Sequence, residues 1–472
     1  MPGEIFLPGQ TKIRPGVYVR TTNTGSPPAA SVPQGIVAVL FTASWGPLAT
    51  VQTLEGGVEE VESLYISGGT IETPKEVFRG NALRVLAFRL GTGGAKATVT
   101  LNDGATTPVN IVKVDAKYVG TVGNQIKITV RDSLSETGKR EILVYQDTTL
   151  RERFTYTAGA YEAQALVDAV ANSNWITASK LAVGDGSLAT VTNQALTGGS
   201  DPTVSGTEYS AGLTAVEALE FNVLVTDSES AAIHATVQTY VDRVRNEGKR
   251  TLGVVGEPTS VALATRITNS KAFNDAAIVY AGNGFKSANG NIEGYKAAAR
   301  VAGMVASGAI TDSLTHTVVS GGTDIVGALT NAEVEQAINS GMLVFTFNAS
   351  KQVQIEYGIN TLVTPAADQD AGWKKIRRVR TRDFLIDSIV RTWDPLIGKV
   401  NNTPDGRATL IAAGQGIINE MISIGALLGG TIIEDPAKPA AGDSAWFVVN
   451  VDDVDSAEKL YITFGFRFSP AA

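Results

Sequence analysis

The chain of 472 residues contains no cysteine, which excludes disulfides, thiolate metal ligands and a cysteine nucleophile. It has two histidines, His234 and His316, so a zinc site would depend on carboxylates, and these show no ligand spacing. It also lacks the roughly 18 uninterrupted apolar residues of a membrane span. The start, "MPGEIFLPGQ", has no basic region followed by an apolar run. We expect a protein made in the cytoplasm that does not insert into a membrane.

Catalytic motifs are missing as well. Asp227 and His234 could be combined with a serine into a hydrolase triad, but the nucleophile motif G-x-S-x-G is absent. The glycine-rich segments 91–97 and 282–290 satisfy neither phosphate-binding pattern. The acidic segment 452–460 resembles the start of a calcium loop, but it lacks the central glycine and the final glutamate. The sequence therefore predicts no catalytic, cofactor-binding or metal-ligating residues, and no cofactor.

The net charge of -8 argues against a general nucleic-acid binder. One basic run departs from this balance, within residues 374–382. Nucleic-acid binding would bring interleaved aromatic residues, and only Trp373 is near. Two interpretations stay open: a solvated face paired with local acids, or docking on an acidic protein surface. The run consists of Lys374, Lys375, Arg377, Arg378, Arg380 and Arg382.

The apolar content of 43% is that of an ordinary globular chain, and the length predicts several domains. Residues 1–34 are rich in Pro, Gly, Thr and Ser and predict an extended arm. Residues 210–360 alternate strand and helix patterns, which indicates a parallel, doubly wound sheet. Strands at 35–43 and 82–90 could join that sheet. Residues 95–200 would then be an insertion whose short, turn-bounded strands favour an antiparallel β-sandwich.

Helix signals are clear in two places. Asp227 precedes the helical pattern of 228–248 and is placed to cap it. Thr403 and Pro404 are typical of a cap and first turn, and the apolar pattern after them predicts a long helix that includes Leu428. Two terminal strands are expected to follow, "SAWFVVNV" and the end of the chain.

The chain ends in "EKLYITFGFRFSPAA", in which large apolar residues alternate strictly with others. That period is typical of a half-buried strand. Each large apolar side chain gains about 1.5–3 kcal/mol on burial, so the strand is expected to pair. It could close the protein's own sheet, or it could join the sheet of a neighbouring molecule, since edge strands are templates for pairing. The short strand pattern at 16–19 could pair in the same way.

Several segments, in order, resemble the tail sheath proteins of contractile bacteriophages and phage-tail-like particles, particularly those of Gram-positive hosts. They run from one end of the chain to the other: "RPGVYVR", "GIVAVLFTASWGPLATVQTL", "KYVGTVGNQIKITV", "ALTGGSDPTVSGTEY", "AARVAGMVASGAITDSLTH", "LTNAEVEQAINSGMLVF", "KIRRVRTRDFLIDSI", "IGKVNNTPDGRATLIAA" and "EKLYITFGF".

The resemblance implies an α/β multidomain protein. Residues 35–94 and 201–362 would form a central α/β domain, a mostly parallel, doubly wound sheet of subtilisin-like topology. Residues 95–200 would form an inserted β-sandwich, 363–457 an α+β C-terminal domain, and 1–34 and 458–472 strand-forming arms. The missing nucleophile motif makes the subtilisin-like label a statement about fold, not proteolysis.

The resemblance also implies a structural, non-enzymatic function. Stacked hexameric rings would form a helical sleeve around a tail tube and contract to drive the tube through the target cell envelope. The partners would be other copies of the chain, the tube protein, and baseplate and tail terminator proteins, in a virion tail or a phage-tail-like particle. The rival hypothesis is an α/β hydrolase-like enzyme with a β-sandwich accessory domain, and a weaker one is a capsid or adhesin subunit.

Within that resemblance, arms exchanged between neighbours would join the subunits. The candidate N-terminal arm residues are Pro15, Gly16, Val17, Tyr18 and Val19. The candidate C-terminal arm residues are Leu460, Tyr461, Ile462, Thr463, Phe464 and Phe466. By position, Lys374, Lys375, Arg377 and Arg378 are candidates to face the tube.

Overall fold

A computed structural model describes residues 4–5, 18–19, 32–159, 162–181, 187–367 and 369–467. The chain divides into two compact units, and the chain passes from one to the other at Arg380/Thr381 and back at Val454/Asp455. We call the described residues of 33–380 and 455–467 the central unit. Residues 381–454 form the C-terminal unit, to which the short strands β1 (Glu4–Ile5) and β2 (Tyr18–Val19) are also assigned.

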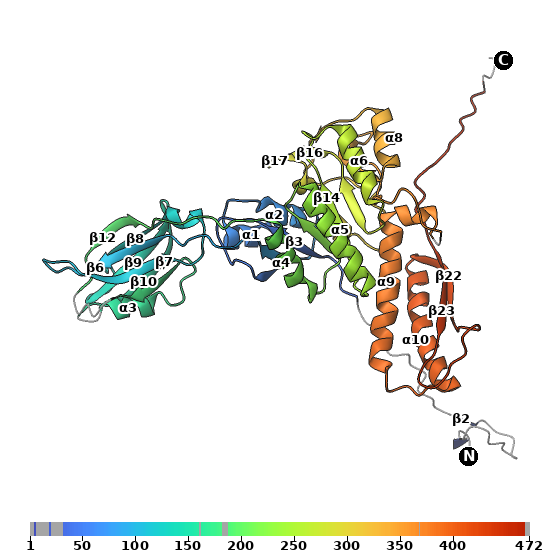
Figure 1. The fold of residues 1–472 in the computed structure, drawn as a ribbon, viewed down its shortest axis with the longest axis horizontal. Helices are drawn as coiled ribbons and strands as arrows, with labels where there is room; N and C mark the ends of the chain where they lie inside the picture. The colour runs from blue at the N-terminus through green and yellow to red at the C-terminus, as the bar shows by residue number, and fades with distance from the viewer. Residues whose placement is uncertain are drawn as a thin grey trace, which may run out of the picture. The chain divides into compact units, whose positions relative to one another are not determined.

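A seven-stranded sheet forms the middle of the central unit (Figure 1). Its inner strands are mostly β-branched and aliphatic runs that are almost wholly buried, as expected for parallel strands covered on both faces. All neighbours pair in parallel except β4 and β5, which are antiparallel. In spatial order the strands are β19 (Met342–Leu343), β15 (Ile278–Ala281), β14 (Leu252–Gly256), β13 (Val223–Thr226), β3 (Ile36–Phe41), β5 (Arg84–Arg89) and β4 (Val51–Leu54).

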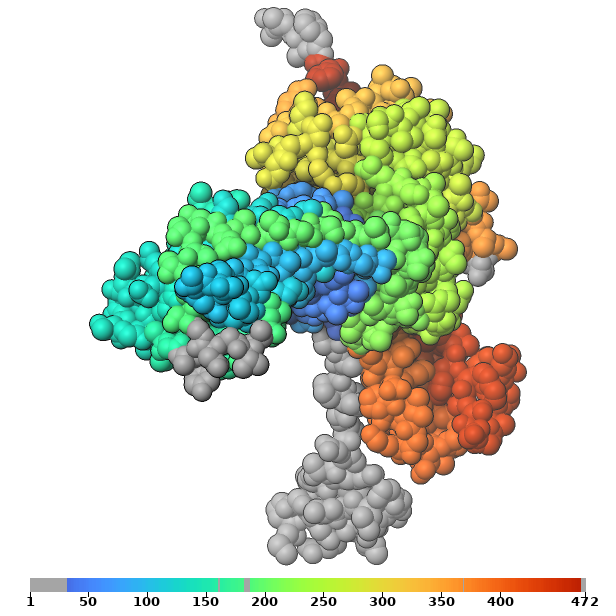
Figure 2. All heavy atoms as spheres, turned by 60° about the vertical axis from the view of Figure 1, so that its left-hand side comes forward, coloured from blue at the N-terminus to red at the C-terminus, as the bar shows by residue number. Residues whose placement is uncertain are grey.

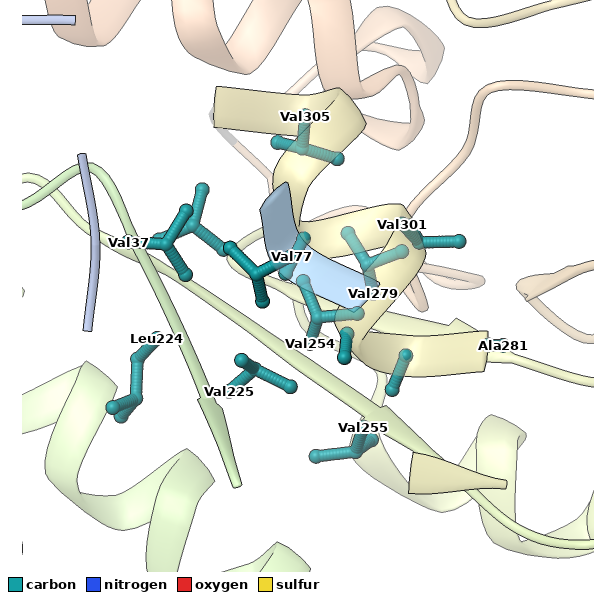
Figure 3. Packing of buried hydrophobic residues seen from close by; sticks show 14 of the residues in the cluster. Val37, Val77, Leu224, Val225, Val254, Val255, Val279, Ala281, Val301 and Val305 are labelled. Atoms are coloured by element: carbon teal, nitrogen blue, oxygen red, sulfur yellow. The ribbon is translucent and has the colours of Figure 1, made fainter. Parts of the chain in front are cut away.

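Helices cover this sheet. α7 (Tyr295–Ser307) packs on β13 and β14, and α2 (Glu72–Arg79) packs on α7 and β3. Figure 3 shows Val77 of α2 and Val301 of α7 among the valines of the strands. Further helices around the sheet, outside the inserted segment, are α1 (Gly57–Tyr65), α4 (Gly206–Glu217), α5 (Ala231–Asn246), α6 (Leu263–Phe273) and α8 (Asn331–Asn339). Short strands complete it: β16 (Gly284–Ser287), β17 (Gly290–Ile292), β18 (Asp324–Val326), β20 (Phe345–Phe347) and β21 (Val353–Ile355).

The inserted segment has its own hydrophobic core between two antiparallel sheets and the helix α3 (Glu162–Ala169). This agrees with the β-sandwich that its short strands predict. One sheet has the order β10 (Thr149–Thr157), β9 (Lys139–Gln146), β8 (Ile126–Asp132) and β12 (Val191–Ala195). The other has the order β11 (Ile176–Lys180), β7 (Asn110–Ala116) and β6 (Thr98–Asn102).

The sandwich is joined to the parallel sheet by more than its two connecting segments. Those segments form antiparallel bridges with each other, Thr92 with Thr203 and Ala95 with Ser200. Trp45, which follows β3, is buried in the core of the sandwich. The insertion is therefore packed into the central unit and is not a loosely tethered appendage; Figure 2 shows it in cyan and green.

The C-terminal unit consists of two long helices and a hairpin. α9 (Ile376–Trp393) starts in the central unit and continues into this one, followed by α10 (Pro404–Ser423) and the antiparallel pair β22 (Leu427–Glu434) and β23 (Phe447–Asp453). Thr403 caps α10 by accepting a hydrogen bond from the amide of Gly406, as its sequence predicts. Trp393 packs on Phe447, their ring centres 5.1 Å apart.

Three details of the sequence interpretation are wrong. Asp227 does not cap α5, whose N-cap is Ser230; its buried carboxylate binds groups that are distant in sequence. The long helix stops at Ser423, because Gly425 takes a φ of 76° and Leu428 belongs to β22. The sequence also predicts that the basic run precedes a helix, but Arg377, Arg378, Arg380 and Arg382 already lie within α9, and only Lys374 and Lys375 precede it. No helix in the described part of the chain is long and apolar enough to span a membrane.

Candidate functional site

The segment after β23 contains the alternating apolar row of the sequence, and its large side chains are in solvent. Leu460, Ile462 and Phe464 are 70–76% exposed, and Tyr461 and Phe466 exceed 90%. Residues 454–467 form no strand with any other described residue. Within the described chain the segment therefore does not close its own sheet. At about 1.5–3 kcal/mol for each large apolar side chain left unburied, such a row is a strong candidate for contact with another molecule.

The N-terminal candidates are described only in part. Tyr18 and Val19 pair in parallel with Glu4 and Ile5. Pro15, Gly16 and Val17 lie outside the described residues, so their role as part of an arm stays a prediction.

The β22–β23 hairpin is a two-stranded sheet with two different edges. On the outer edge of β22, the side-chain amide of Gln415 from α10 substitutes for a neighbouring strand. Its Nε2 donates to the carbonyl of Gly430 at 3.0 Å, and its Oε1 accepts from the amide of Ile432 at 3.2 Å. Among the described residues, β23 has no strand partner besides β22. The edge of β23 therefore presents backbone donors and acceptors that could pair with a further strand.

The hairpin also leaves apolar side chains exposed that a further strand could cover. Ile432 is buried against α10, whereas Leu428 is 75% exposed and Ile433 is 44% exposed. Isolated two-stranded sheets are only marginally stable in water. An added strand would supply both the missing backbone bonds and apolar cover.

The basic run is already engaged within the chain. Lys374 donates to the carbonyl of Ile338 at 2.8 Å, and Arg378 pairs with Asp370 at 3.1 Å. Lys375 is 2.7 Å from a carboxylate oxygen of Asp455. Only the Arg378–Asp370 pair fits the first of the two interpretations, because Lys374 bonds to a backbone carbonyl and Asp455 is 80 residues from Lys375 in the sequence. Whether Lys374, Lys375, Arg377 and Arg378 also face a tube stays a prediction.

The carboxyl ends of the parallel strands are where α/β proteins commonly bind ligands, and here the polar groups are used to hold the fold together. Asp227, at the end of β13, accepts from the amide of Thr42 at 2.9 Å and from the hydroxyl of Tyr209 at 2.5 Å. Burial raises the pKa of Asp227. Glu257, at the end of β14, accepts from Tyr280 at 2.6 Å and from the side-chain amide of Asn269.

Neither histidine is arranged for catalysis with a serine hydroxyl. Nε2 of the buried His234 donates to the backbone carbonyl of Ser228 at 2.8 Å, and burial lowers the pKa of His234. His316 is exposed in a turn with a φ of 58°. The described part of the chain also contains no group of three or more carboxylates and imidazoles that could hold a metal ion. The residues that sequence analysis considered for a triad are therefore structural in this fold.

Sequence analysis missed two features of the candidate site, the strand β22 and the residue Gln415. The sequence pattern extends the preceding helix to Leu428, within β22, although Gly425 and the β-branched pair Ile432 and Ile433 are signals that separate the two elements. Gln415 carries no such signal, because only the fold places it beside β22.

Three family models match the chain in succession, and all describe parts of one protein. The phage tail sheath protein β-sandwich domain matches residues 92–201, the central domain of that protein matches 203–361, and its C-terminal domain matches 368–467. The matched boundaries follow the architecture described above, with the sandwich inserted before most of the central domain.

Individual relatives are similar to the chain over nearly its whole length. The chain is 26% identical to the phage-like element PBSX protein XkdK of Bacillus subtilis, covering 98% of this chain and 99% of that protein. The structure of a sheath tail protein from Desulfitobacterium hafniense superposes with a TM-score of 0.73 at 25% identity, covering 93% of this chain and all of that one. The helical sheath of the anti-feeding prophage in its contracted state shares the fold, with a TM-score of 0.54 at 11% identity over 97% and 99% of the two chains.

Proposed function

The chain belongs to the phage tail sheath family, and from that premise we propose that it is the subunit of a contractile sheath. In this proposal it assembles as stacked hexameric rings around a tail tube and contracts to drive the tube through a target cell envelope. Its role is structural, and its place is a virion tail or a phage-tail-like particle after synthesis in the host cytoplasm. The fold shared with a sheath in its contracted state supports this function.

The observation that carries the proposal is the exposed apolar row at Leu460–Phe466. A second copy of the chain offers a matching acceptor, the edge of β23. A strand added there would pair its backbone groups with β23, and alternate side chains would cover the hairpin. We assign Leu460, Tyr461, Ile462, Thr463, Phe464 and Phe466 to the donated strand, and Pro15–Val19 to the corresponding N-terminal arm.

Strands donated between copies would explain how a sheath changes length without losing subunits. Because each donated strand is continuous with its own chain, neighbouring copies can rotate and slide while they stay attached. The energy of contraction would come from the difference between the interfaces of two assembled states, so that no nucleotide or other cofactor is needed. The tube, the baseplate and a tail terminator protein are the other partners in this proposal, with no role for nucleic acid.

By their position, Lys374, Lys375, Arg377 and Arg378 are the candidates for the surface that faces the tube. No observation favours the hydrolase hypothesis, since His234 and Asp227 do not approach a serine hydroxyl in a catalytic arrangement. A capsid or adhesin subunit would also polymerise, but without a contractile tube.

Electron microscopy of the protein expressed alone tests the function directly. Hollow striated tubes or stacked rings are expected. A field of dispersed particles, even after addition of a tube protein as nucleus, would contradict the proposal.

Deletion of residues 459–472 tests the donated strand. Because residues 459–467 form no strand with any other described residue, the deleted protein should unfold at the temperature of the full chain but form no tubes. A mixture with full-length protein sharpens the test. The deleted subunits keep the acceptor edge but lack the donor, so they should shorten or interrupt tubes at low molar fractions. Normal tubes from the deleted protein alone would refute the strand donation.

A further inference from the structure

Two motifs that the sequence analysis left without a function contact each other. They are the basic run within residues 374–382, which leads into α9, and the acidic segment 452–460, which resembles the start of a calcium loop. Their contact involves residues 455–458, which return to the central unit after the chain has formed the C-terminal unit. We call residues 455–458 the root of the C-terminal arm.

The carboxylate of Glu458 is the centre of this contact. Its Oε1 accepts hydrogen bonds from the hydroxyls of Ser313 and Thr315, at 2.7 and 2.8 Å. Its Oε2 lies 2.6 Å from Nζ of Lys375. Only 7% of the Glu458 side chain is exposed, and 16% of the Lys375 side chain. A carboxylate removed from water to this extent is stable only if its oxygens are partnered, and these are.

Lys375 holds the root at a second point. Its ammonium is also 2.7 Å from the carboxylate of Asp455, and it lies beside the ring of Tyr357. Burial alone would lower the pKa of Lys375, but the bonds to Asp455 and Glu458 outweigh it and raise the pKa. Arg377 adds a hydrogen bond to the hydroxyl of Ser456 at 3.1 Å. Lys375 therefore stays charged while it is bound to the root.

The residues that follow the root are exposed, unlike Glu458. From Leu460 to Phe466 the large side chains are exposed, and the described residues include no partner strand. Figure 2 shows the last described residues, in dark red, emerging beside the yellow and orange surface of the central unit. The chain is thus held by the side chains of Asp455, Ser456 and Glu458, whereas the large side chains that follow are mostly exposed.

We propose that Glu458, Asp455 and Lys375, with Ser313 and Thr315, form an ionic anchor that fixes the point at which the C-terminal arm leaves the central unit. The anchor separates the arm from the C-terminal unit, although the two are adjacent in sequence. If the arm is donated to a neighbour, which rests on the proposed function, a pull on it is transmitted to the central unit through Glu458. The C-terminal unit, which lies between Arg380 and Asp455 in the sequence, then does not carry that load.

Because the chain contains no cysteine, introduced cysteines can be labelled specifically to test the anchor. Cysteines introduced at Ala457 in the root and at the exposed Ala288 of the central unit can carry nitroxide labels. The distance distribution between the labels is measured by pulsed electron resonance. Labelled subunits are diluted into unlabelled ones, so that distances between copies do not contribute. The measurement reports a contact within one chain and needs no tube, so its result is independent of the proposed function.

We expect one narrow distance in the otherwise unchanged chain. Glu458→Ala should broaden the distribution severalfold, because the hydroxyls and Lys375 lose their common partner. Lys375→Met should do the same. Lys459→Ala, which changes an exposed charge next to the root, is the matched control and should leave the distribution narrow. A broad distribution before substitution, or a narrow one in Glu458→Ala, would overturn the anchor.

Discussion

Arg89 on β5 donates a 3.0 Å hydrogen bond from its guanidinium to the backbone carbonyl of Val119, which belongs to the inserted sandwich. The same guanidinium donates to the carbonyls of Ala43 and Gly46 in the segment after β3. The side chain is fully buried, and burial lowers the pKa of Arg89 to about 10. One cation thus joins the parallel sheet to the insertion through three backbone carbonyl groups.

Replacement of Arg89 by methionine should therefore destabilise the central unit. Methionine fills much of the space but leaves three carbonyls without this donor, two of them buried and that of Val119 partly buried. An unsatisfied buried polar group costs about 1–3 kcal/mol. We expect a loss of about 3 kcal/mol or more in the free energy of unfolding, measured by denaturant titration with tryptophan fluorescence, to which Trp45 and Trp175 contribute.

Arg84→Met is the matched control for that substitution. Arg84 lies on the same strand, but its ion pair with Glu55 is exposed, and such pairs contribute about 0–1 kcal/mol. Equal losses for the two variants would show that Arg89 has no special role at this junction.

The stability of the central unit should also depend on pH through Asp242 of α5. Burial and the neighbouring Asp275 carboxyl raise the pKa of Asp242 from 3.8 to about 7. Between these values the folded state binds a proton that the unfolded state does not, so this contribution to stability is lost as pH rises. Asp242→Asn should raise the melting temperature at pH 8 and change it little at pH 4.

The comparison of Asp242→Asn with the unchanged protein at each pH removes the contributions of other groups. Glu59→Gln, at an exposed carboxylate on α1, serves as the control and should show no such pH-dependent gain. If Asp242→Asn melts at a lower temperature than the unchanged protein at pH 8, the carboxyl pair does not destabilise the fold in the way described.

The elements that could be predicted from the sequence are those determined by local pattern. The buried strands β3, β13 and β14 appear as apolar runs, and the α10 start appears as Thr403 followed by proline. The exposed terminal row was identified because its alternation is regular. In each case the information lies within a few residues, since a strand or a cap is defined by its own neighbours in sequence.

The features that the sequence did not predict depend mostly on contacts between residues that are far apart in it. Asp227 was assigned to a nearby helix end, but its partner Thr42 is 185 residues away. The partner of Lys375 in the root, Asp455, is 80 residues away, and the acidic segment and the basic run carry no mark that they meet. β22 is a different case, because a local signal exists: it continues the apolar pattern of α10, and the positive φ of Gly425 separates the two. Contacts between distant residues are set by the fold and not by local propensity.

Two glycines on helices should respond to alanine in opposite directions. Gly303 of α7 lies against α2, and a Cβ there would be 2.1 Å from the carbonyl oxygen of Val77. Gly303→Ala should therefore force the helices apart and cost about 1–3 kcal/mol. Gly416 of α10 has open space around its Cβ position. Gly416→Ala should stabilise the C-terminal unit by about 0.5–1 kcal/mol through helix propensity.

Calorimetry of the two glycine variants checks both signs. The two changes are chemically identical, so the difference between them isolates the close approach of α2 and α7. A stabilised Gly303→Ala protein would mean that these helices can separate at no cost.

Gln415 should protect one edge of the hairpin from incorrect pairing. Its side chain bonds to Gly430 and Ile432 on the outer edge of β22, which leaves β23 as the open edge. Gln415→Ala removes both bonds, at a cost of about 1–2 kcal/mol in the C-terminal unit, and exposes a second edge for association.

Asn419→Ala, one turn later on α10, removes a contact to Gln415 but none to β22 and is the control. In a chain that lacks residues 459–472, light scattering should detect concentration-dependent association for Gln415→Ala and not for Asn419→Ala. Association of both variants, or of neither, would show that the Gln415 amide does not determine which edge of the hairpin is available.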